Sequence, residues 1–157
     1  MTITLAALSA AHVVLAAVWL GAMTYSLVIV QPRALRLLGE QRFEEFAAVL
    51  AHGARTAVLA VMAGLALTGA ALVVLVLAAG DQDRTWWLLV VAKIVALLAA
   101  LAVFSWVSWR LWPRRIFALD AELPAVRAVF RRVAITLLAL VAAQFVLGAL
   151  AGAVARN

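Results

Sequence analysis

Two basic side chains lie inside long apolar runs of this sequence, where ionisable residues are rare. His12 lies in a run that begins at about Leu5, and Lys93 is the only ionisable residue between Trp86 and Trp109. A charged group in such a run costs about 2.5–3.5 kcal/mol to insert into a membrane, so it usually faces a partner, a cavity or a ligand. An imidazole and an amine could bind a metal, hold an anionic group such as a propionate, or relay protons.

The composition and the length of the apolar runs predict an all-α, polytopic membrane protein. Of the 157 residues, 69% are hydrophobic, whereas soluble domains are nearer half apolar. We expect one domain, residues 1–157, that forms a bundle of four transmembrane helices. Each predicted span has about 20 residues or more, enough to cross about 30 Å of hydrocarbon. The predicted spans cover residues 5–30, 56–79, 86–109 and 133–154.

Local signals predict where the helices begin and end. The first span should end before Gln31–Pro32, because proline disfavours helix at the residue before it. The second should end at Gly80, a usual helix terminator. Glu40–His52 has apolar residues at helical spacing, so the second helix should begin early, as an amphipathic stretch. Pro113 and Pro124 are expected to break the helices between the third and fourth spans.

The arginines predict the orientation of the bundle. Four lie between the first two spans and six between the last two, whereas only Arg84 and Arg156 lie elsewhere. Positive residues are enriched in cytoplasmic loops, so both long connections should be cytoplasmic and both termini should face outward. This topology explains the net charge of +6, and we expect no binding of nucleic acid. The absence of cysteine excludes disulfides and thiolate metal sites.

The predicted topology places His12 and Lys93 at the same depth, about 10 Å below the outer interface. We therefore expect a site between the first and third spans. Trp19 lies two turns from His12 and could line this site, with Met23 on the same face. His52 lies at the cytoplasmic start of the second span, about 20 Å or more from His12 along the membrane normal, so the two should not share one haem iron.

Simpler interpretations of the two basic residues stay open. The stem of Lys93 could lie along apolar surface while its ammonium reaches water at the outer interface. His12 could hydrogen-bond to a neighbouring backbone group or serine and have no further role.

Small residues predict close packing of helices in the second and fourth spans. Gly148 and Gly152 lie one turn apart, and Gln144 on the same face can hydrogen-bond across to another helix. Gly64 and Thr68 form a similar face in the second span.

Several short patterns resemble the membrane domain of the copper-resistance protein D (CopD) family. They are His12-x6-Trp19-x-Gly21 followed by Pro32, Leu67-Thr68-Gly69 in the second span, and Trp87 to Lys93 with Arg110-LWP-Arg114-Arg115 after the third span. The chain is also similar to HemJ-type protoporphyrinogen oxidases in its four expected helices, first-span histidine and third-span lysine.

These resemblances imply a function at the bacterial inner membrane. Similarity to CopD implies copper handling, and similarity to HemJ implies porphyrin or haem binding, with His12 and Lys93 at the matching positions. We expect a membrane protein that handles copper or haem b, with His12 as a ligand and Lys93 against an anionic group. Two alternatives are a protoporphyrinogen oxidase and a non-catalytic assembly protein that packs against a second copy or other membrane subunits.

Overall fold

The computed structural model describes residues 2–80, 82–119 and 121–155, and its secondary structure there consists of helices. Asp81 and Arg156 lie outside the described residues, although Arg156 entered the charge argument for orientation. The chain divides into two compact units, Met1–Asp81 and Gln82–Asn157. Each unit is a helical hairpin.

The first unit is a nearly continuous helix that reverses once. Helix α1 (Thr2–Tyr25) leads into a π-helical turn η1 (Ser26–Val30) and then α2 (Gln31–Ala79). The backbone leaves helical geometry inside α2 at Gly39, with φ 73° and ψ 174°. Positive φ is costly for residues with a Cβ, so glycine at this position lets the chain turn back.

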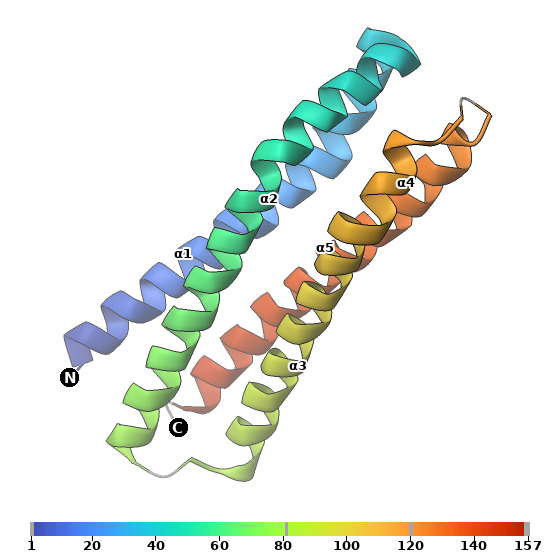
Figure 1. The fold of residues 1–157 in the computed structure, drawn as a ribbon. Coiled ribbons are helices and arrows are strands. Elements are labelled where there is room, and N and C mark those ends of the chain that lie inside the picture. The colour runs from blue at the N-terminus through green and yellow to red at the C-terminus, as the bar shows by residue number, and fades with distance from the viewer. Residues whose placement is uncertain (1, 81, 120, 156–157) are drawn as a thin grey trace. The chain divides into compact units, whose positions relative to one another are not determined.

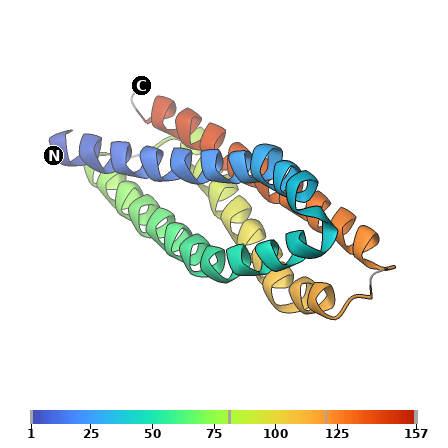
Figure 2. The same cartoon turned by 90° about the horizontal axis from the view of Figure 1, so that it is seen from above.

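Contacts across the first unit show that its two arms lie side by side (Figures 1 and 2). His12 on α1 hydrogen-bonds to Thr68 on α2, 56 residues away in sequence. Nearby, Leu15 lies against Gly64, where an added Cβ would be 3.0 Å from the leucine Cδ2. A straight helix could not make these contacts, so the reversal at Gly39 produces a hairpin.

The second unit is a hairpin of α3 (Arg84–Trp106) and α5 (Leu123–Val154) (Figure 1). Between them, α3 continues through a π-helical turn η2 (Val107–Leu111) into the short α4 (Trp112–Ile116). The first turn of α3 is capped by Asp83, whose Oδ1 accepts a hydrogen bond of 2.8 Å from the Trp86 N–H. Such a cap satisfies a donor that the helix itself leaves open.

The prolines at the arginine-rich ends do not end the helices, contrary to the sequence-based expectation. The helix runs through Pro32 to the Gly39 region, and α4 contains Pro113. In both places a five-residue π-helical turn precedes the proline. The residue just before the proline donates its N–H to the carbonyl oxygen five residues earlier, Gln31 to Ser26 and Trp112 to Val107. This wider turn relieves the clash that a proline ring makes in an α-helix.

Other predicted helix ends agree with the structure. Helix α2 ends at Ala79, followed by Gly80 with φ 153°, and the second arm is already helical at Glu40. Pro124 lies in the first turn of α5, where its missing N–H costs nothing.

Among the residues that the structure describes, three helical stretches are long and apolar enough to cross a membrane, namely Ile3–Ala79, Arg84–Ile116 and Leu123–Val154. Large apolar side chains are exposed along them, including Val18, Leu67 and Leu98 at 58–72%. Apolar surface in contact with water is unfavourable, so these surfaces fit contact with lipid. The chain is therefore a multi-pass membrane protein.

Candidate functional site

The His12 ring is held by a hydrogen bond from one arm of the first unit to the other. Its Nδ1 lies 2.6 Å from the Thr68 hydroxyl oxygen. Two carbonyl oxygens of α2 lie within reach of the single hydrogen of that hydroxyl, those of Gly64 at 2.7 Å and Leu65 at 3.3 Å, and the nearer one is its better acceptor. With the hydroxyl hydrogen on that carbonyl, the oxygen accepts from His12; Nδ1 then carries the proton of the neutral ring and Nε2 the lone pair.

Small residues on α2 bring the imidazole close to the backbone of that helix. A Cβ added at Gly69 would lie 3.4 Å from the Cε1 atom of His12, which is within the tight range of real contacts. Gly64 accommodates Leu15 one turn further along α1. The half-buried ring thus lies against a surface formed by Gly69 and the Thr68 hydroxyl.

Trp19 is buried, with 8% of its surface exposed. Its indole N–H is also buried and has no hydrogen-bond partner among the described residues. Seven residues of α1 separate it from His12, or about 10 Å along the helix. A buried donor without an acceptor is uncommon, which marks the Trp19 indole as a place where a bound acceptor could dock.

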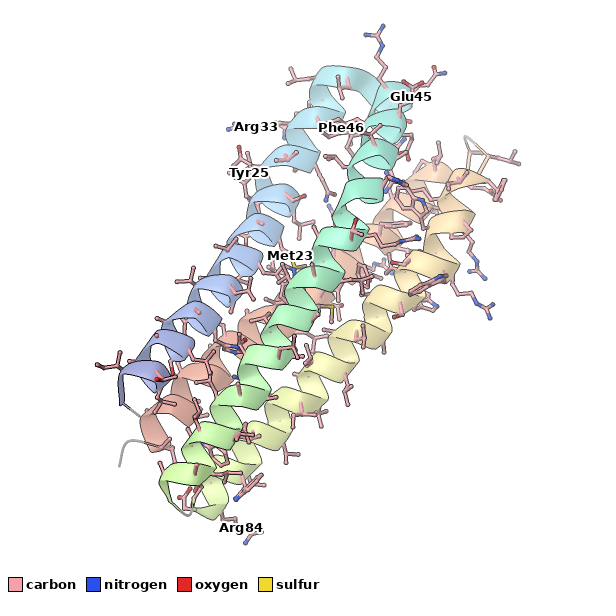
Figure 3. The ribbon with its side chains drawn as sticks, turned by 60° about the vertical axis from the view of Figure 1, so that its left-hand side comes forward. Met23, Tyr25, Arg33, Glu45, Phe46 and Arg84 are labelled. Carbon is pink, nitrogen blue, oxygen red and sulfur yellow. The ribbon has the colours of Figure 1, made fainter. Side chains whose placement is uncertain are left out.

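Met23 and His52 lie too far from His12 to share one metal ion with it. Met23 is on α1, eleven residues away (Figure 3), or about 16 Å along the axis. His52 is exposed on α2, sixteen residues before Thr68, or about 24 Å from the level of His12. A metal at His12 would therefore receive neither the thioether nor the second imidazole from the same chain.

Lys93 lies in the second unit, where α3 packs on α5. A Cβ added at Gly148 would be only 3.1 Å from the lysine Nζ, so the amine occupies the space that a side chain would need. Lys93 makes no hydrogen bond or ion pair with the described residues. One turn before Gly148, the side-chain amide nitrogen of Gln144 is buried and has no hydrogen-bond partner among the described residues. The space beside Gly152 is open.

The structure thus brings His12 together with Thr68, and Lys93 together with Gly148. His12 belongs to the first unit and Lys93 to the second, so the predicted His12–Lys93 site stays a prediction. Residues with carboxylate, imidazole or thiol groups do not gather in threes to hold a metal within the described ranges.

Sequence reasoning assigned Thr68 to helix packing and missed its contact with His12. A depth comparison gives the missing signal, because a hairpin that turns near Gly39 pairs residue 12 with a residue close to 66. Thr68 is the polar side chain nearest to that position. A hydroxyl at matching depth in an apolar arm is the expected partner for an imidazole in the other arm.

Comparison of the chain with protein-family models found no match, and comparisons with curated proteins and with solved structures found none either.

Proposed function

We propose that the chain crosses the bacterial inner membrane four times, with both termini on the outer side. The reversal at Gly39 supports two crossings by Ile3–Ala79, because the two arms of this stretch contact each other. The second unit would add two more through α3 and α5. The excess of arginines near the two hairpin turns supports cytoplasmic turns.

We further propose that this membrane protein binds haem, and that Nε2 of His12 would hold the iron. The hydrogen bond between His12 Nδ1 and Thr68 carries the proposal. Histidines that ligate metals almost always donate the other ring N–H to a second group, which fixes the tautomer and the ring orientation. Thr68 plays this part for His12.

The donor set favours haem over a copper ion. Copper bound by protein alone needs several nitrogen or sulfur ligands, and no cluster of three His, Cys, Asp or Glu side chains occurs in the described ranges. Haem iron already has four ring nitrogens and requires one or two axial ligands from the protein. A single oriented imidazole therefore fits haem better.

The residues around His12 would fit such a group in two further respects. The buried indole N–H of Trp19 offers a donor for an acidic substituent, and the apolar arms would exclude water from the iron. A bound haem would supply one-electron redox chemistry. His12 would hold it, and Thr68 would hold His12.

Absorption spectroscopy of the full-length protein tests this proposal. The chain is purified in detergent, titrated with haem and monitored at the Soret band. We expect a saturable spectral shift that His12→Ala abolishes and that His52→Ala leaves intact, since His52 is exposed and distant. Binding that survives His12→Ala would overturn the assignment. Tight binding of copper without a Soret band would favour copper handling instead.

A further inference from the structure

A hollow of about 250 Å³ lies on the second unit, where α3 ends and continues through η2 into α4. Its lining residues are Trp106, Arg110, Leu111 and Arg114. Trp106, Arg110 and Arg114 follow each other at intervals of four, and the π-helical turn η2 lies between the first and the last. Such turns occur often at functional sites. The hollow is several-fold larger than the about 30 Å³ that one water molecule takes up in the liquid.

The two arginines of this hollow have no acidic partner among the described residues. Arg110 and Arg114 are exposed, and they make no ion pair, hydrogen bond or ring contact within the described parts of the chain. The neighbouring Arg115 differs, because its guanidinium lies 4.9 Å from the Phe130 ring and 5.7 Å from the Trp112 ring. Arg115 therefore joins α4 to α5, whereas the charges of Arg110 and Arg114 are available to a ligand.

The surroundings of the hollow indicate the class of ligand. It lies near the end of an apolar helix that fits a membrane, where tryptophan and arginine meet lipid headgroups. Leu111 gives the hollow an apolar wall, and Trp106 is half exposed beside it. Guanidinium groups bind phosphate oxygens in a bidentate manner, and basic pockets beside membrane helices bind anionic lipid headgroups.

We propose that this hollow binds the phosphodiester headgroup of an anionic phospholipid, with Arg110 and Arg114 on the phosphate and Trp106 against the glycerol region. The site is independent of haem and of His12. It also needs no particular orientation of the chain, because both leaflets present phosphate groups.

Native mass spectrometry of the full-length protein tests the site. The protein is transferred to micelles that contain phosphatidylglycerol or phosphatidylcholine, and the bound lipids are counted over a titration. We expect phosphatidylglycerol to bind the double variant Arg110→Gln/Arg114→Gln about thirty-fold more weakly than the original protein, as for two arginines at a lipid surface. The binding of phosphatidylcholine should differ far less between the two proteins.

A matched control separates a specific site from general charge. Arg131 and Arg132 are exposed on α5, nine and ten residues after the connection 117–122, and neither lines the hollow. The variant Arg131→Gln/Arg132→Gln loses the same charge and should keep its lipid. Equal losses in the two double variants would overturn the proposal.

Two further measurements close the remaining outcomes. Arg110→Lys/Arg114→Lys keeps the charge but loses the bidentate geometry, so it should still bind phosphatidylglycerol several-fold more weakly. This variant decides the question if the glutamine variant does not fold. Inorganic phosphate is titrated in parallel, and binding as strong as that of the lipid would overturn the assignment to a lipid.

Discussion

Removal of the Thr68 hydroxyl is the most informative perturbation of the first unit. Thr68→Val keeps the shape of the side chain but deletes the hydroxyl that hydrogen-bonds to His12 Nδ1. Hydrogen bonds between membrane helices contribute about 0.6 kcal/mol on average and up to about 1.7 kcal/mol. The short distance of 2.6 Å and the partial burial place this bond in the upper part of the range. We expect a loss of about 1–1.5 kcal/mol in the free energy of unfolding.

The same substitution should weaken haem binding more than it weakens the fold. Loss of a group that orients a metal-ligating histidine typically lowers metal affinity about 10–100-fold. We expect this loss for haem in Thr68→Val, measured by Soret titration, while unfolding in sodium dodecyl sulfate gives the stability change. Thr68→Ser keeps the hydroxyl and should restore most of both.

Thr24 provides a matched control for this test. Its hydroxyl also donates to a carbonyl four residues back, that of Leu20, but no described contact links it to the other arm. Thr24→Val should therefore change neither haem affinity nor stability by more than a few tenths of a kcal/mol. Equal effects of Thr24→Val and Thr68→Val would refute the argument that Thr68 holds His12.

Three other predictions concern packing and capping, and each is checked by detergent unfolding. Gly64→Val should cost about 1–3 kcal/mol by overpacking against Leu15, and a second substitution, Leu15→Ala, should recover part of this loss; no recovery would show that the contact is not the cause. Gly148→Val should be destabilising because it displaces the lysine amine of α3, whereas Gly152→Val faces open space and should be tolerated; the reverse order would contradict the observed packing. Asp83→Ala should cost about 1 kcal/mol through loss of the α3 cap, and an effect no larger than that of Asp83→Asn would argue against capping.

The helical, membrane-embedded character of the chain could be predicted from the sequence because it depends on composition and run length. The end at Gly80 and the early start near Glu40 also follow from local signals, a glycine after an apolar run and apolar residues at helical spacing. The continuation through Pro32 and Pro113 could not be predicted in this way. A proline ends a helix only if no wider turn accommodates it, and the π-helical turns are set by backbone bonds that leave no side-chain signal.

The candidate site was predictable as residue types but not as a network. An isolated imidazole in an apolar span needs a polar partner, yet several serines and threonines in the chain could supply one. The choice of Thr68 depends on the register of the hairpin, which is set by the position of Gly39. His12 lies 27 residues before this glycine and Thr68 lies 29 after it, so the two arms bring them to nearly the same height.

This register also explains why the neighbouring glycines belong to the same arrangement. Once Gly39 fixes the level of Thr68 opposite His12, the neighbouring positions of α2 meet the neighbouring turns of α1. Gly64, one turn before Thr68, meets Leu15, and Gly69, the residue after Thr68, adjoins the imidazole. A residue inserted between Gly39 and Gly64 would rotate the rest of the second arm by about 100° and remove Gly64, Thr68 and Gly69 from the interface. The hydrogen bond to His12 thus depends on the length of the second arm as much as on the threonine itself.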